Sequence, residues 1–468
     1  MDITRGTAMR FDLLGLIMNP FVLMFITVAT GLLFGKLRVG RFSFGTSGTL
    51  FSGLLLGWLM YKLGSSIVAK GSDAAGYDAA QAMLDAGIIH SNFFDAFLIF
   101  FVAAVGLLAA KDMGIIIKRY GKVFVVIGIV TTLVGAAGAY AATAVLYHTN
   151  AYEVAGVYTG ALTSSPGLGA ALEAAESQAT EYADRYEDLP EGQKKQVLLI
   201  IDDSGALTPE NTPELTKDQK QTYISDAQAG VGVGHAIGYP FGVIVVILAA
   251  NFLTSIFSID VEEEKRRYAL EMEEARKTIK VRQVETGPFS TISFVVTCVV
   301  GYLVGSIEIY MGPLGYFSLG STGGVLILGL VLGYIGKIGP LRFKMDPTVL
   351  GMLRELCLAF FLAVVGLRYG YKTFDAILGS GIALVVVSTL IAIISTMVAF
   401  LLGRYVFKLN WVILIGAICG GMTSTPGLGA AIDALDSDEP AAGYGATYPF
   451  ALLGMIVFTI LLHKLPLL

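Results

Sequence analysis

The chain of 468 residues carries 32 Lys and Arg against 37 Asp and Glu, so its formal net charge is −5. Hydrophobic residues make up 55% and charged residues 15%, where soluble domains have roughly 45–50% and 25%. This balance disfavours a soluble globular domain, a disordered chain and a nucleic-acid-binding protein. We therefore expect an all-α polytopic membrane protein, with the 56 glycines marking close helix packing or helix breaks.

The apolar runs predict the membrane spans. A spanning helix needs about 20 apolar residues. Twelve uncharged runs reach or approach this length, namely 13–35, 42–61, 96–110, 123–152, 154–172, 227–259, 286–307, 309–336, 356–367, 376–403, 409–432 and 441–462. The three cysteines lie far apart within apolar stretches, so we expect packing residues rather than a disulfide or a metal site, and no cofactor.

The charged segments orient the chain. Segment 176–226 holds twelve acidic and five basic residues, whereas 260–285 carries seven Lys and Arg in a stretch typical of a helix. Because cytoplasmic segments are enriched in Lys and Arg, we expect an extracytoplasmic insertion at 176–228 and a cytoplasmic charged helical linker at 259–286. The polar segment 62–92 is also expected outside.

The sequence contains a duplication. Residues 160–177 read GALTSSPGLGAALEAAES and residues 420–437 read GGMTSTPGLGAAIDALDS, with eleven of eighteen positions identical. At the same offset, 100–107 aligns with 360–367, and a Tyr-Pro-Phe block follows each copy. The chain is thus divided into a first membrane repeat at 1–258, the linker, and a second membrane repeat at 287–468.

The charge bias favours a folded-back TS(S/T)PGLG segment over a spanning one. If it is a re-entrant hairpin, each repeat crosses about five times and the basic loops fall inside. An odd number of crossings inverts the second copy relative to the first, so we expect inverted-topology repeats whose hairpins meet near the midplane.

The repeated block has the composition of a broken helix. Proline removes a backbone donor and the glycines allow close approach, so the helix breaks and a new one starts with a hydroxyl N-cap and proline first. Its N-terminus would attract a carboxylate. The alternative is a structural kink. The candidate substrate-binding residues are Thr163, Ser164, Ser165, Pro166, Gly167, Gly169, Thr423, Ser424, Thr425, Pro426, Gly427 and Gly429.

A second group of residues is a candidate for coupling or gating. Asp95 and Glu355 occupy matching positions and are expected to begin equivalent helices, where an acid also complements the helix dipole. His235 precedes a Tyr-Pro break and is either a proton-sensitive ligand or a polar packing residue. Arg354 could pair with a carboxylate or snorkel. The group comprises Asp95, Glu355, His235, Arg354, Tyr239 and Tyr448.

The paired TSSPGLGAALEAA and TSTPGLGAAIDAL blocks resemble the aspartate:alanine exchanger family of bacterial secondary transporters. The resemblance covers nearly all membrane segments. It implies exchange of amino acids or carboxylates across the bacterial inner membrane, with the duplicated regions forming the site. Many relatives carry soluble domains between the halves, where this chain has only the charged helix.

We therefore expect a secondary active antiporter of small carboxylates or amino acids, such as aspartate, alanine or dicarboxylates, working by alternating access. An elevator-like motion on a homodimeric scaffold follows by analogy. The alternative is a cation or proton antiporter using Asp95, Glu355 and His235, and the coupling ion, H⁺ or Na⁺, stays open. No enzyme motif such as HExxH, GxSxG or a P-loop is present, so no catalytic residues are expected.

Overall fold

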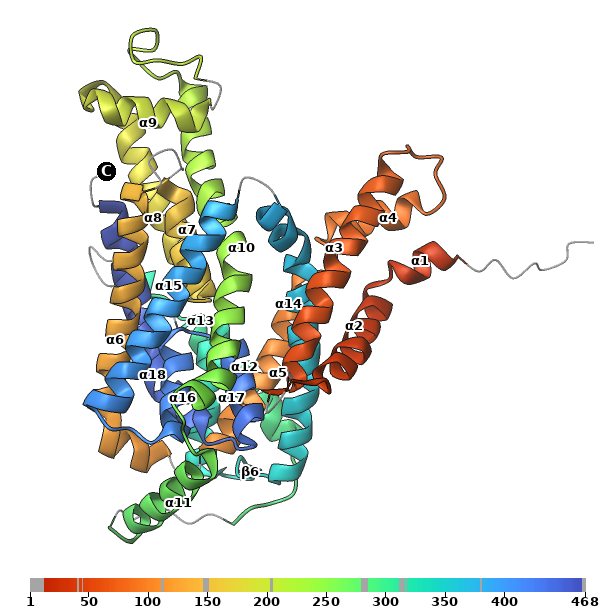
Figure 1. The fold of residues 1–468 in the computed structure, drawn as a ribbon, viewed down its shortest axis with the longest axis vertical. Helices are drawn as coiled ribbons and strands as arrows, with labels where there is room; N and C mark the ends of the chain where they lie inside the picture. The colour runs from red at the N-terminus through yellow and green to blue at the C-terminus, as the bar shows by residue number, and fades with distance from the viewer. Residues whose placement is uncertain are drawn as a thin grey trace, which may run out of the picture. The chain divides into compact units, whose positions relative to one another are not determined.

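The computed structural model describes residues 12–39, 42–43, 45–110, 113–145, 151–202, 205–278, 285–310, 316–317, 319–378 and 381–464. These residues are mainly helical and fall into two compact units (Figure 1). The units do not follow the boundary between the two predicted repeats, and the repeat boundaries at 258 and 287 stay predictions. Helices α5 and α14 contribute residues to both units.

The smaller unit comprises the described residues up to Phe97 together with Ala359–Phe374. Its elements are α1 (Leu13–Ile17), α2 (Pro20–Gly35), β1 (Arg38–Val39), β2 (Phe42–Ser43), η1 (Gly45–Ser47), α3 (Gly48–Val68), α4 (Tyr77–Asp85), the start of α5 (Ser91–Ala109) and the middle of α14 (Pro347–Leu378).

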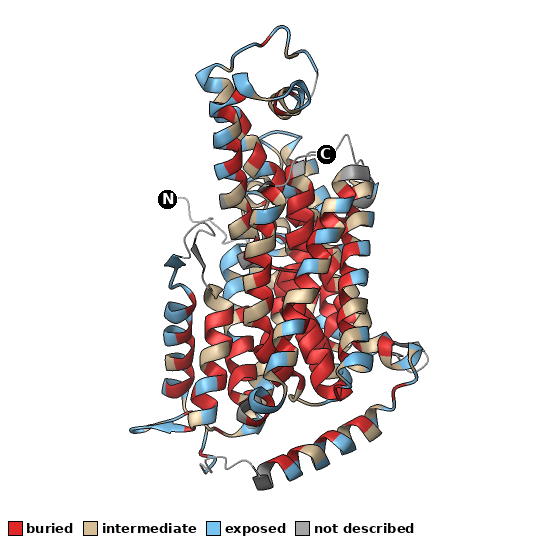
Figure 2. Ribbon diagram, turned by 90° about the vertical axis from the view of Figure 1, so that its left-hand side faces the viewer, coloured by how far each residue is buried: buried red, intermediate tan, exposed pale blue. Residues whose placement is uncertain are grey.

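The larger unit comprises Leu98–Leu358 and Asp375–Leu468. Besides the remainders of α5 and α14, its elements are α6 (Met113–Val145), α7 (Ala151–Ala161), α8 (Ser165–Asp184), η2 (Tyr186–Asp188), α9 (Glu191–Ile201), α10 (Lys217–Ile256), α11 (Val261–Thr278), α12 (Thr291–Gly305), β3 (Ile309–Tyr310), β4 (Tyr316–Phe317), α13 (Gly320–Ile335), β5 (Lys337–Ile338), β6 (Leu341–Arg342), α15 (Ile382–Leu401), the π-helical turn η4 (Leu402–Val406), α16 (Trp411–Gly421), α17 (Thr425–Leu435) and α18 (Pro440–Lys464). Figure 2 shows that the long helices carry many buried positions along with intermediate and exposed ones.

The helices confirm a multi-pass membrane protein. Among the described residues, seven are long and apolar enough to cross a membrane, namely Gly45–Val68, Ser91–Leu108, Ile115–Thr143, Lys217–Ile256, Pro347–Asp375, Ile382–Val406 and Pro440–His463. Four shorter apolar helices accompany them. Large apolar side chains remain exposed on several of these segments, including Ile292 at 68% and Leu303 at 61% on α12. Lipid contact accounts for such exposure without an aqueous cost.

One expectation about the spans needs correction. The first predicted span, 13–35, is interrupted, because Asn19 caps α2 by accepting from the Phe21 amide and Pro20 occupies its first turn. The structure also shows that much of the acidic insertion is helical. The ends of α8 and α10 extend into it, and with α9 they enclose a small core that contains Tyr186, Leu198 and Tyr223.

Glycines let pairs of helices cross closely, and the pattern occurs twice. In the smaller unit, a Cβ on Gly53 of α3 would lie 2.9 Å from the Gly366 Cα of α14. In the larger unit, a Cβ on Gly329 of α13 would lie 3.2 Å from the Gly106 Cα of α5. Gly106 and Gly366 are equivalent in the duplication. Helix α3 of the first copy thus packs on α14 of the second, and α13 of the second copy packs on α5 of the first. This supports the duplication, whereas its inversion across a membrane stays a prediction.

A matched pair of glycine substitutions tests the close crossings. In Gly301→Ala the new Cβ would lie 2.5 Å from the Val325 Cα, so α12 and α13 must separate. We expect a loss of about 1–3 kcal/mol of stability, typical of overpacking. In Gly351→Ala the Cβ meets nothing within 4 Å, and helix propensity should stabilise by up to about 1 kcal/mol. Thermal unfolding in detergent measures both; equal midpoints would contradict the proposed packing constraint.

Candidate functional site

The two copies of the repeated block are broken helices, as the sequence predicts. Helix α7 ends at Ala161 and α8 begins at Ser165, and α16 ends at Gly421 before α17 begins at Thr425. Figure 1 shows α7 and α8 in the upper half of the larger unit and α16 and α17 in its lower half. We name α7 with α8 the first hairpin and α16 with α17 the second hairpin. Whether either is re-entrant in a membrane stays a prediction.

The same hydrogen bonds close both breaks. The Ser164 amide donates to the Thr159 carbonyl at 2.8 Å, and the Ser424 amide donates to the Cys419 carbonyl at 2.8 Å. Each serine hydroxyl then accepts from a glycine amide, Gly167 at 3.1 Å and Gly427 at 3.2 Å. The N-cap thus lies one residue earlier than expected, and proline is the second helical residue rather than the first.

The two breaks contact each other directly. The Thr163 hydroxyl donates to the Met422 carbonyl at 3.1 Å, and the Thr423 hydroxyl donates to the Leu162 carbonyl at 2.8 Å. Both threonines have left-handed backbone conformations, with φ of 54° and 49°. A β-branched residue rarely adopts this conformation, which glycine would adopt freely. Threonine instead supplies the hydroxyl that satisfies a carbonyl of the opposite hairpin.

Each hairpin is supported by helices from both copies. Helix α10 packs along α7, yet its Val246 also faces Gly427 at the start of α17. Helix α18 packs along α16, and its Met455 Cε would lie 2.9 Å from a Cβ on Gly167 of α8. Helices α10 and α18 therefore each pack on both hairpins. We call this crossed packing, together with the two threonine hydrogen bonds, the interlock.

The free donors at the start of α17 are few. Pro426 has no N–H, Ser424 caps Gly427, and the Leu428 amide bonds the Ser424 carbonyl at 3.0 Å. Within the described part of the chain, the Thr425 amide is the one N–H of this turn that has no acceptor. The helix start thus offers a carboxylate one amide and the dipole, whereas an uncapped helix begins with four free amides.

The tyrosines and His235 lie beside the hairpins. The His235 Nδ1 is 2.9 Å from the Thr159 hydroxyl, which can also donate to the Gly156 carbonyl. Which of the two atoms donates depends on the imidazole tautomer, and in either tautomer the contact joins α10 to α7. The Tyr239 ring lies 5.5 Å from the His235 ring.

Sequence reasoning missed Tyr444. Its hydroxyl lies 3.1 Å from the Thr425 hydroxyl, and its ring stacks on the predicted residue Tyr448 at 5.4 Å. The four-residue spacing between the two tyrosines places them on one face of α18, which is the signal that could have found it.

The remaining candidates lie on helices α5 and α14. Asp95 is the fifth residue of α5 and Glu355 the ninth residue of α14, so neither lies in a first helical turn, and the expectation that they begin equivalent helices is wrong. Both are exposed, and Asp95 belongs to the smaller unit. Arg354 pairs with Asp438.

Burial is described for the candidate residues of the second hairpin but only for some of those in the first. Pro426, Gly427 and Gly429 are buried, and a Cβ on Gly429 would lie 2.5 Å from a Leu358 methyl. The side chains of Ser165 and Pro166, and the surroundings of Gly169, lie outside the described part of the structure.

Substitutions at Thr423 test the interlock. Thr423→Val removes the hydroxyl while keeping the branched shape, so the Leu162 carbonyl loses its donor. We expect a loss of about 1–3 kcal/mol of stability, because a buried acceptor is left unsatisfied. Thr423→Ser keeps the hydroxyl and should lie close to wild type. Thermal unfolding in detergent measures both variants, and a serine variant as unstable as the valine variant would contradict the interlock.

Comparisons with known proteins agree on a transport class. A family model described as a predicted permease membrane region matches residues 79–255 and 293–464, on either side of α11. An uncharacterised transporter of Bacteroides thetaiotaomicron is 41% identical over 160 residues, which are 34% of this chain and 30% of that protein. An uncharacterised transporter of Rhodopirellula baltica is 40% identical over 162 residues, 35% of this chain and 30% of that protein.

A putative transport protein of Edwardsiella ictaluri is 38% identical over 157 residues, covering 33% of this chain and 28% of that protein. The chain thus spans less than a third of the length of the curated relatives it matches. The family model, in contrast, covers both hairpins and most of the helices around them. The chain belongs to the aspartate:alanine exchanger family of membrane permeases.

Proposed function

We propose that the protein is a secondary active antiporter of small carboxylates or amino acids, such as aspartate, alanine or dicarboxylates. The observation that carries the proposal is the reciprocal contact between the two breaks, made by Thr163 and Thr423. It places two helix starts of opposite copies in one buried region. A carrier needs such a site, where irregular backbone is tolerated because it is enclosed by protein.

The chemistry of these helix starts favours an anionic group. Helix N-termini attract a carboxylate with up to about 2 kcal/mol each in partly buried geometry. Two of them together would be worth up to roughly a thousandfold in affinity. The Thr425 amide and the hydroxyls of Thr425 and Tyr444 supply the directional contacts at α17. This strength suits a carrier that must also release its substrate.

Alternating access would follow from movement of the interlocked hairpins with α10 and α18 as one body. The threonine bonds join the hairpins to each other, and the crossed packing of Val246 and Met455 joins them to these helices. In this proposal the protein is a homodimer of the bacterial inner membrane, with an elevator-like motion. The insertion 176–228 then lies outside and α11 inside.

The alternative, a cation or proton antiporter, has less support. Asp95 and Glu355 lie exposed on different helices, whereas the His235 side chain is buried beside Thr159 of α7. No contact among the described residues joins the three side chains. We therefore retain carboxylate exchange as the proposed function.

Uptake into proteoliposomes tests this proposal. Liposomes holding unlabelled aspartate, alanine or a dicarboxylate should take up the same labelled compounds faster than empty liposomes. We expect Gly427→Ala to reduce uptake by at least tenfold, because its Cβ would collide with the Val246 side chain at the start of α17. Gly232→Ala is the matched control, since its Cβ on α10 meets nothing within 4 Å.

Three results of the uptake experiment would contradict the proposal or part of it. Folded wild-type protein that moves none of the tested carboxylates would overturn the proposed substrate class. Uptake that a pH gradient drives without any internal substrate would favour the proton antiporter instead. Equal uptake by Gly427→Ala and Gly232→Ala would contradict the proposal that the second hairpin forms part of the substrate site.

A further inference from the structure

Helix α11, the charged linker between the repeats, has one buried face. Glu264, Tyr268, Met272 and Ala275 recur at spacings of four, four and three residues and are 2–6% exposed. These spacings follow one side of a helix. A glutamate is almost never so buried unless it is paired. Glu264, at 5% exposed, therefore requires an explanation that the transport proposal does not give.

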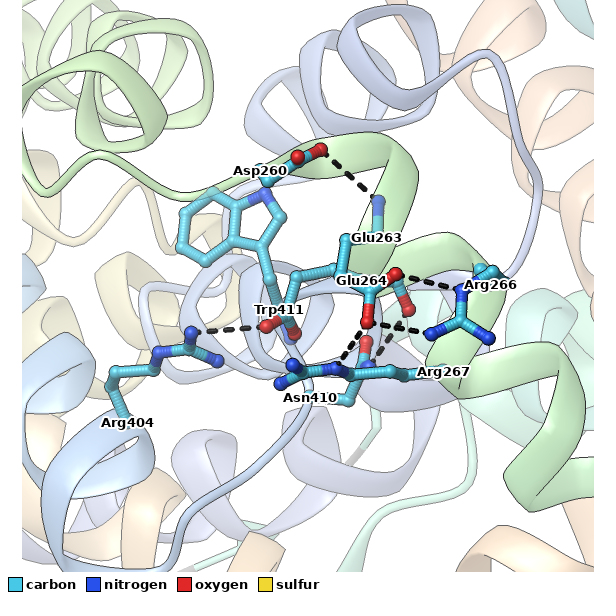
Figure 3. Close-up of polar contacts among 8 residues, drawn as sticks. All are labelled: Asp260, Glu263, Glu264, Arg266, Arg267, Arg404, Asn410 and Trp411. Carbon is cyan, nitrogen blue, oxygen red and sulfur yellow. Dashed lines mark hydrogen bonds and ion pairs between the residues drawn. The ribbon is translucent and has the colours of Figure 1, made fainter.

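Figure 3 shows what Glu264 binds. One carboxylate oxygen accepts from the Arg404 guanidinium at 3.0 Å, and the other accepts from the Trp411 backbone amide at 2.7 Å. The Asn410 side-chain amide donates to the Glu264 backbone carbonyl at 2.9 Å. Trp411 is the first residue of α16 and Asn410 its N-cap, and Arg404 lies in the π-helical turn η4.

These groups have the chemistry of a carboxylate-binding site. The Trp411 amide, the positive end of the α16 dipole and the Arg404 guanidinium converge on one carboxylate in a buried position. We propose that the start of α16 and Arg404 form a carboxylate-binding site that Glu264 occupies from within the chain. The linker helix is thereby a latch fastened to the second hairpin by one carboxylate.

A second contact fastens the other limb of the same hairpin. The Tyr268 hydroxyl donates to the Glu439 carboxylate at 3.3 Å, just beyond the end of α17. One turn further on, Glu271 pairs with Arg119 at 3.0 Å and accepts from the Tyr120 hydroxyl, both on α6. The inner face of α11 therefore joins the base of the second hairpin to a helix of the first repeat.

Glu263 offers a matched control on the same helix. Its carboxylate accepts from Arg266 at 2.7 and 2.8 Å and from Arg267 at 2.8 Å, all within α11. Hydrogen bonds from Arg266 and Arg267 lower the pKa of Glu263 to about 2, so its carboxylate is ionised at neutral pH. It has the same charge as its neighbour Glu264 and touches no other helix among these contacts.

The test uses acetate as the probe, because Glu264→Ala removes the atoms of an acetate ion. Trp411 is fully buried and is one of two tryptophans, so in a Trp58→Phe background its emission reports on this site. Glu264→Ala should lower the thermal midpoint by roughly 5 °C or more and shift the Trp411 emission to the red. Acetate at about 0.1 M should restore at least half of both changes, whereas equal chloride should not.

Glu263→Ala should leave the emission unchanged and show no effect specific to acetate. Glu264→Gln, which refills the position and can still accept from the Trp411 amide, should be intermediate and should not respond to acetate. Glu264→Ala protein that stays folded only with acetate present would support the site equally. A variant that acetate restores no better than chloride, or that behaves like Glu263→Ala, would overturn the proposal.

The contact of Glu264 with Arg404 and Trp411 can be tested without transport. Every readout is made on detergent-solubilised full-length protein and needs no substrate flux. Failure of carboxylate uptake in proteoliposomes would therefore leave the latch intact. Failure of the acetate effect would leave the transport proposal intact.

Discussion

The constraint on which this structure depends is that backbone polar groups freed by a broken helix must be satisfied inside the protein. At each break a serine hydroxyl caps the new helix, and a threonine hydroxyl reaches the carbonyl of the other break. One hairpin alone would leave that carbonyl without its donor. The duplication is therefore a structural requirement as well as a trace of origin, because the two breaks complete each other.

The outer ends of the two hairpins are held by segments that are not duplicated. At the first hairpin, the insertion encloses Tyr152 of α7, whose hydroxyl lies 3.1 Å from that of Tyr223 on α10, and a row of alanines on α8. At the second hairpin, α11 binds Trp411 and Glu439 through Glu264 and Tyr268. The ends of the two hairpins are thus held in different ways, the first by packing in a small core and the second by a buried carboxylate.

Local chemistry decided what could be predicted from the sequence. The helix breaks follow from Ser-Ser-Pro-Gly and Ser-Thr-Pro-Gly, and the linker helix from a run without Gly or Pro, so both are confirmed. The predicted N-cap differs from the observed one by one residue, because two adjacent hydroxyls can cap the helix. The helix start at Asn19-Pro20 lies within a long apolar run, so the run alone predicts one continuous span. Glu264 was one acid among several on a charged helix. Its burial depends on Arg404 and Trp411, about 140 residues away, and no local pattern encodes that contact.

The second hairpin begins both of its helices with a positive dipole end, and the protein treats the two ends differently. At α16 the Trp411 amide donates to the Glu264 carboxylate, which also pairs with Arg404. A side chain of the protein itself therefore occupies that helix start. At α17 the capping serine and proline remove two donors, yet the Thr425 amide keeps no acceptor among the described residues. In the proposed function, the start of α17 is where an external carboxylate would bind, as Glu264 binds at the start of α16.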